Sequence, residues 1–241
     1  ESVVSTISTD ALSISFDERG VLTAVTDRHT GRNVVVEGQP VLLNVVYDGA
    51  GAPVYPSAVA YAGGTLVASF PGGAEVTVAV TPSAASILFN VTHTASSGAA
   101  IGTLVFVNIT VALPSAVQSP AAAFDPDPSR SFSLLLLPSD LLVQTQTTIP
   151  GYNYGAHSPK DPAQLDGSRG VEIIGRSSAV EGPLVGRAAL LWSGLHAQMD
   201  QAIQEAEQRF GLPSPSIGGR WAKQNAGQGY FLIDLDPASL N

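Results

Sequence analysis

The residues best suited to chemistry gather around one long polar segment. Between two strand-like runs, residues 151–169 read GYNYGAHSPKDPAQLDGSR, and connections of this length in a compact domain are uncommon and often functional. The segment carries His157, and Glu172 stands on the strand-like run that follows. Because general acid–base catalysis most often uses imidazole and carboxylate groups, His157 and Glu172 are our candidate catalytic residues. The alternative is an ordinary surface histidine that happens to precede a strand glutamate.

The same segment is the candidate binding site for a sugar. Tyr152, Tyr154 and His157 could stack on a carbohydrate or hydrogen-bond to it, because aromatic faces cover apolar C–H groups while their polar tips stay satisfied. The alternative is that these aromatic rings pack against the edge of the sandwich beneath the loop and have a structural role only. We therefore predict a carbohydrate or glycan as the partner of this chain.

The sequence contains no motif typical of a metal site, a reactive thiol or a nucleotide-binding site. The chain of 241 residues has no cysteine, and its four histidines lack the H-x-x-x-H spacing of a zinc site. No phosphate-binding loop, nucleophile elbow or dinucleotide fingerprint occurs. The acidic run at residues 125–128, DPDP, lacks the glycine and terminal glutamate of a calcium loop. We expect this run to be a solvated turn, and we predict neither a metal nor a cofactor.

The charge balance argues against two further classes of partner. The formal net charge is −9, whereas nucleic acids and anionic membranes are bound by clustered Lys and Arg. No apolar run is long enough to span a bilayer, and short ones such as Leu134–Leu137 resemble buried strands. We therefore predict no nucleic-acid partner and no membrane insertion.

Strands must position the candidate residues, because period-two patterning dominates the chain. Apolar and polar residues alternate in Leu12–Phe16 and in Val76–Val80. Comparable runs occupy residues 33–37, 41–47, 65–70, 86–92, 102–113, 131–137, 141–148, 171–175 and 187–192. Turn residues separate the runs, and crossover helices are missing between them. The pattern predicts an all-β fold, a large antiparallel β-sandwich.

One helix is predicted after these strands, over about residues 196–210. Met199, Ile203 and Ala206 recur at helical spacing, and Gly211 supplies a C-terminal stop. We divide the chain into a β-sandwich over residues 1–194, a packing helix over 195–211 and a connector over 212–241.

Two stretches of the chain resemble a known family. Residues 16–36, FDERGVLTAVTDRHTGRNVVV, contain a D-x-x-T-G-x-N pattern, and residues 186–235 contain the patterns G-L-P-x-P and G-x-W-x-K. These stretches resemble the β-supersandwich domains, of galactose-mutarotase-like fold, that precede the catalytic barrels of several glycoside hydrolase families. The resemblance covers the two ends of the chain only.

The resemblance implies a non-catalytic supersandwich module of a carbohydrate-active, glycoside-hydrolase-like protein, with scaffolding and glycan-binding roles. It implies that Tyr230–Leu235 is the first strand of a C-terminal (β/α)₈ barrel domain and that Asp236 begins the first helix of that barrel. An alternative within the same fold is a stand-alone mutarotase-like sugar epimerase. That alternative requires His157 and an acid such as Glu172 to converge on one sugar ring.

We expect an extracellular protein, either secreted or associated with a cell wall or surface. Two N-glycosylation sequons begin at Asn90 and Asn108, and the chain opens on Glu1 as a product that has lost its targeting segment would. A third class of function is structural. In a matrix or filament of extracellular glycoprotein, neighbouring subunits would complete the exposed edge strands.

Overall fold

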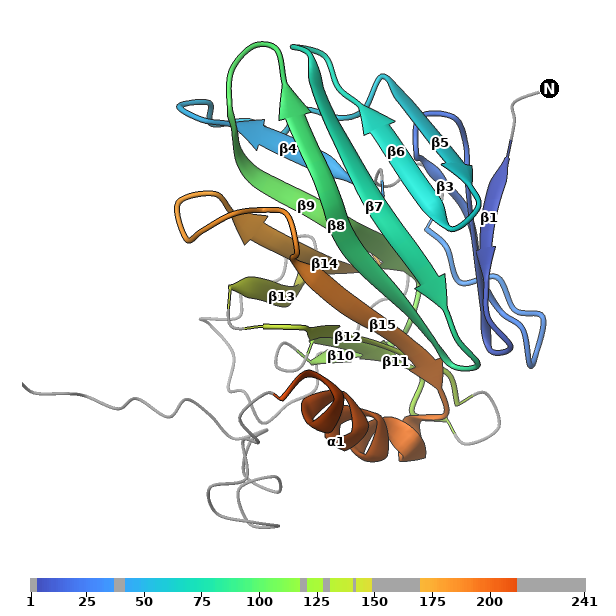
Figure 1. The fold of residues 1–241 in the computed structure, drawn as a ribbon. Coiled ribbons are helices and arrows are strands. Elements are labelled where there is room, and N and C mark those ends of the chain that lie inside the picture. The colour runs from blue at the N-terminus through green and yellow to red at the C-terminus, as the bar shows by residue number, and fades with distance from the viewer. Residues whose placement is uncertain are drawn as a thin grey trace, which may run out of the picture.

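Three antiparallel sheets form the computed structural model of this chain (Figure 1). The structure describes residues 4–36, 42–117, 121–127, 131–140, 142–148 and 170–211. The largest sheet has eight strands in the order β10-β11-β12-β15-β8-β7-β6-β5. Its strands are β5 Ala58–Ala62, β6 Thr65–Ser69, β7 Ala74–Pro82, β8 Ser86–Ser96, β10 Ser115–Val117, β11 Ala121–Phe124, β12 Ser133–Pro138 and β15 Ala188–Gly194.

The other two sheets have four and three strands, in the orders β13-β14-β9-β4 and β1-β2-β3. Their strands are β1 Ser5–Ser8, β2 Leu12–Phe16, β3 Leu22–Asp27, β4 Asn44–Tyr47, β9 Ile101–Val111, β13 Val143–Thr148 and β14 Val171–Ser178. Apolar side chains from all three sheets meet in one core cluster, and the eight-stranded sheet lies across the four-stranded sheet (Figure 1). The predicted antiparallel β-sandwich is confirmed.

Residues 33–36 join the two smaller sheets into one layer. Asn33 forms a bridge with Thr26 of β3, and Val35 forms a bridge with Val111 of β9. Backbone hydrogen bonds extend this contact, as the amide of Ala112 donates to the carbonyl of Val34 at 2.7 Å. We predicted a strand in this region. In the described residues the segment forms two isolated bridges instead, because it pairs with each of the two sheets at a single residue.

The run of four leucines in β12 is apolar because both of its faces are covered. Leu134 and Leu136 lie in the core between the layers, whereas Leu135 and Leu137 lie in a second cluster beneath the helix α1. A strand buried on both faces reads as a continuous apolar run rather than an alternating one.

The helix α1, Met199–Phe210, covers the outer face of the eight-stranded sheet beside β12 and β15 (Figure 1). A short 3-10 helix, His196–Gln198, precedes it. Met199, Ala202 and Ala206 are buried, and Gly211 ends the helix with φ 62°, a left-handed conformation that glycine adopts without steric cost. The predicted helix and its stop residue are confirmed, while the connector over residues 212–241 lies outside the described residues.

A β-bulge in β9 reverses the alternation of that strand. Gly175 of β14 pairs with Val107, but the next residue, Arg176, pairs with Val105, so Phe106 is the extra residue. Gly175 also lets the layers approach, because a Cβ there would lie 3.2 Å from Leu136 Cδ2 of the opposite layer.

We expect Leu135→Ala and Leu136→Ala to destabilise the protein by similar amounts. Both side chains are fully buried, and truncating a buried leucine lowers the free energy of unfolding by about 2–5 kcal/mol. Urea denaturation monitored by circular dichroism measures both values, with Val180→Ala, at an 89% exposed side chain, as the control. A loss in Leu136→Ala alone would mean that the helix does not cover this face.

Candidate functional site

The outer face of the four-stranded sheet presents polar side chains in rows. Because the bulge shifts the register of β9, residues 103, 105, 108 and 110 of that strand lie on the same outer face as residues 172, 174, 176 and 178 of β14. The rows are Thr148–Glu172–Thr110, Gln146–Ile174–Asn108, Gln144–Arg176–Val105 and Ser178–Thr103. Strict alternation would have placed Asn108 on the same face as Phe106, which packs in the core.

Glu172 is held at one end of this face by a buried amide. The Asn108 side chain is 3% exposed, and its Nδ2 donates to Glu172 Oε1 at 3.0 Å. Its Oδ1 is buried and has no hydrogen-bond partner in the described part of the chain. A buried polar atom without a partner is unusual in folded proteins and calls for an explanation.

Arg176 lies two residues further along the face from Ile174. Its Nε donates to Gln144 Oε1 at 3.1 Å, and Gln144 Nε2 donates to Glu181 Oε1 at 3.4 Å. Beside it is a pocket of about 270 Å³ lined by Thr103, Gln144, Arg176, Ser177 and Ser178. Asn108, Gln144 and Arg176 were not predicted as members of this face. Glu172 and Arg176 share one side of a strand by their spacing, which is the signal that could have found Arg176.

The other predicted site residues lie outside the described residues. Tyr152, Tyr154 and His157 belong to residues 149–169, which connect β13 to β14. On the strands that flank this segment, Thr148 of β13 pairs with Glu172 of β14. The pairing of His157 with Glu172 and the stacking role of the two tyrosines stay predictions.

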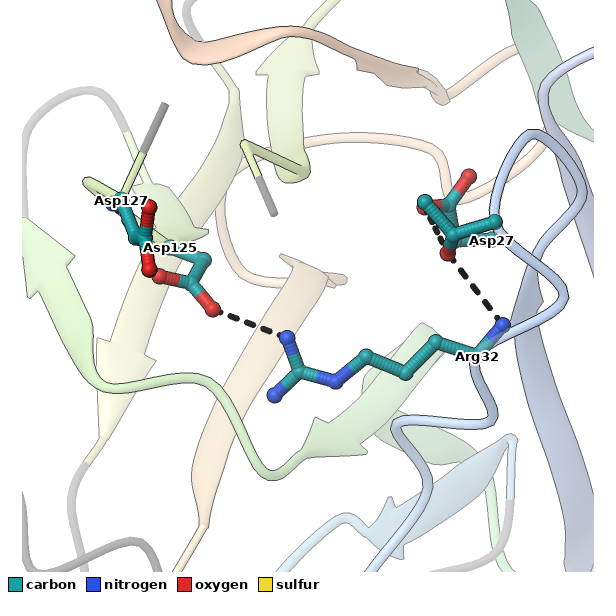
Figure 2. A network of polar contacts seen from close by, with 5 residues as sticks. Asp27, Arg32, Asp125 and Asp127 are labelled. Atoms are coloured by element: carbon teal, nitrogen blue, oxygen red, sulfur yellow. Dashed lines mark hydrogen bonds and ion pairs between the residues drawn. The ribbon is translucent and has the colours of Figure 1, made fainter. Parts of the chain in front are cut away.

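A second polar cluster lies between the layers and is not the solvated turn that we expected. Asp125 is 2% exposed, and its Oδ2 lies 2.8 Å from Arg32 Nη1 (Figure 2). Asp125 follows β11 of the eight-stranded sheet, whereas Arg32 follows β3 of the opposite layer. The prediction of a solvated turn was wrong at Asp125, because an ion pair from a distant part of the chain buries its carboxylate.

The D-x-x-T-G-x-N residues, 27–33, form the turn that contains Arg32 and positions its side chain for this ion pair. Asp27 Oδ2 accepts from Thr30 Oγ1 at 2.6 Å, and Gly31 has φ 74°. Asn33 Oδ1 accepts from the amides of Val25 and Val35 at 3.0 and 3.2 Å. The residues that carry the family resemblance at this end of the chain therefore act in folding.

The two glycosylation sequons are placed differently. Asn90 lies on β8 and is half-buried, with a buried Oδ1 that lacks a partner in the described chain. Asn108 lies on a central strand and uses Nδ2, the nitrogen that would carry a glycan, to bind Glu172. Glycosylation at either residue stays a prediction.

Two kinds of feature are absent from the described residues. No group of three or more His, Cys, Asp or Glu side chains is arranged to hold a metal ion. No helix there has the length and apolar character to cross a membrane.

Comparison with known proteins identifies no family for this chain. No family model matches the sequence, and no curated protein matches it. Among solved structures, it is similar to a protein from Escherichia coli K12 named "Putative aldose 1-epimerase", with a TM-score of 0.29 and 9% identity over 81% of this chain and 100% of that chain. A TM-score and identity this low support no inference about the fold or the activity of this chain.

We expect Arg32→Gln to lower the free energy of unfolding by about 1–3 kcal/mol, because it removes a cation that pairs with the buried Asp125 carboxylate. The partial exposure of Arg32, 35% of its side chain, keeps the effect below that of a fully buried pair. Urea denaturation measures the change, and Arg19→Gln is the control because it removes the same charge from an exposed turn. Equal stability of the two variants would show that the ion pair does not hold the layers together.

Proposed function

We propose that this chain is a non-catalytic carbohydrate-binding β-sandwich module of a secreted, carbohydrate-active glycoprotein. The observation that carries the proposal is the arrangement of Asn108 and Glu172 on the outer face of the four-stranded sheet. A buried amide fixes a carboxylate there while its own carbonyl oxygen stays without a partner in the described chain.

This arrangement suits the hydroxyl groups of a sugar. Each hydroxyl is both a donor and an acceptor, so it can donate to the Glu172 carboxylate. The Asn108 amide, which is itself buried, holds that carboxylate in place. Further hydroxyl-binding side chains, Thr148 and Gln146 among them, occupy the same face.

Catalysis needs a second group that the described face does not contain. An epimerase requires an acid and a base on opposite sides of the sugar ring. Of the described histidines, His29 lies in the turn after β3, His93 lies on β8 and His196 stacks on Phe124 with ring centroids 4.3 Å apart. We therefore place binding ahead of the epimerase alternative, which depends on His157.

Glycan binding is expected to depend on Glu172. Isothermal titration calorimetry with cellohexaose, xylohexaose, mannohexaose and a galacturonate oligomer should show saturable binding of at least one of these probes. We expect Glu172→Ala to weaken that binding by about tenfold or more, because hydrogen bonds to a charged group contribute about 1.5–3 kcal/mol. Glu75→Ala, at an exposed position on β7, is the matched control and should bind like the parent protein.

Two results would contradict the proposal. Failure to bind any of the four probes, or equal binding by Glu172→Ala and the parent protein, would remove the sugar site from this face. Faster interconversion of sugar anomers in NMR exchange spectra, lost in Glu172→Ala, would instead establish the epimerase alternative.

The secreted, glycosylated part of the proposal makes a prediction of its own. Upon expression in a eukaryotic secretory system, we expect a glycan at Asn90 and none at Asn108, because the Asn108 amide nitrogen is buried and bound to Glu172. Peptide mass spectrometry before and after deglycosylation measures the occupancy of both sites. Occupancy of Asn108 in folded protein would contradict this placement.

A further inference from the structure

The pocket beside Arg176 contains a positive charge that no acidic side chain of the described residues neutralises. Its guanidinium makes one hydrogen bond, from Nε to Gln144, and no ion pair joins it to another described residue. The Gln144 amide lies between Arg176 and Glu181 in a hydrogen-bonded chain. The nearest acid in this chain of contacts is therefore bound to the amide instead of to the guanidinium.

Four other arginines of the described chain form structural contacts. Arg32 and Arg187 form ion pairs with aspartates, Arg28 donates to a backbone carbonyl, and Arg209 lies over the ring of Phe210. Arg176 lines a polar pocket, and its two terminal nitrogens have no hydrogen-bond partner among the described residues. Arg176 therefore supplies a local positive charge in a protein whose formal net charge is −9.

The pocket has the size and lining of a site for a small polar group. Its volume of about 270 Å³ is close to the lower end of the range for ligand pockets, about 300–1,000 Å³. Thr103 contributes a hydroxyl with no hydrogen-bond partner in the described residues, and Ser178 contributes a second hydroxyl that contacts the carbonyl of Gly102 at 3.5 Å. The lining thus combines a cation with neutral hydrogen-bonding groups.

We propose that this pocket binds the anionic substituent of an acidic glycan, a carboxylate or a sulfate ester, through the terminal nitrogens of Arg176. The planar guanidinium presents two parallel N–H donors that match the two oxygens of either group. Arg176 lies four positions after Glu172 on an extended strand, a distance of about 13 Å. One oligosaccharide can therefore place neutral hydroxyls at Glu172 and its charged group at Arg176.

This inference rests on the proposed function, and its test separates the two. Trigalacturonate is compared by calorimetry with its fully methyl-esterified form, which has the same sugar rings without the charges. A sulfated galactan oligosaccharide and its desulfated form provide the second pair. We expect at least one charged probe to bind about tenfold more tightly than its neutral form, since charge-assisted hydrogen bonds contribute about that factor.

Substitution at the pocket assigns the preference to Arg176. In Arg176→Gln, we expect the charged and neutral members of the pair to bind with equal affinity. Arg176→Lys should keep part of the preference, because it retains the charge but loses the planar pair of donors. Arg19→Gln removes one positive charge from an exposed turn and should keep the whole preference.

The outcomes decide between the carboxylate and the sulfate, and they can overturn the inference. A preference for only one of the two pairs identifies the group that the pocket takes. Equal binding of charged and neutral forms by the parent protein, or an unchanged preference in a folded Arg176→Gln, overturns the inference and leaves the proposed function intact. Absence of binding by all four of these probes overturns the inference, and it overturns the proposed function only when cellohexaose, xylohexaose and mannohexaose also fail to bind.

Discussion

The β-bulge in β9 determines which side chains of that strand point to the outer face of the four-stranded sheet. One extra residue, Phe106, changes the alternation of the strand, so Asn108 faces away from the core while Phe106 packs inside it. Without that residue, the amide that holds Glu172 would point toward the opposite layer, where a buried acceptor without a partner is unfavourable. Bulges redirect side chains in this way without ending a sheet. The candidate site therefore depends on a local feature of strand pairing.

The body of the sandwich is stabilised by contacts away from this face. The helix α1 covers the outer side of β12 and β15, and the Arg32–Asp125 ion pair connects the two layers across 93 positions of sequence. The D-x-x-T-G-x-N turn presents Arg32 to Asp125, as its internal hydrogen bonds show. Since these features lie elsewhere in the fold, substitutions on the outer face of β14 can test binding with little disturbance of the core.

The sequence predicted the elements whose pattern is local, and it missed those set by distant neighbours. Strict alternation identified Leu12–Phe16, and the glycine stop identified the end of α1. The strand Ala121–Phe124 was not predicted, because alanine has low β-propensity and pairing with β12 determines its conformation. Glu172 was chosen by its residue type and by its place on the strand after the long polar segment, whereas its partner Asn108 follows from the register between β14 and a strand more than sixty residues earlier.

Mapping the binding surface by NMR tests the central claim most directly. Galacturonate oligomer is titrated into ¹⁵N-labelled protein, and the backbone amide shifts are followed for each residue. The account predicts perturbations along the outer-face residues of β9 and β14, from Thr103 to Thr110 and from Glu172 to Ser178. Perturbations confined to the eight-stranded sheet or to α1 would contradict it, because the glycan would then bind away from Glu172 and Arg176.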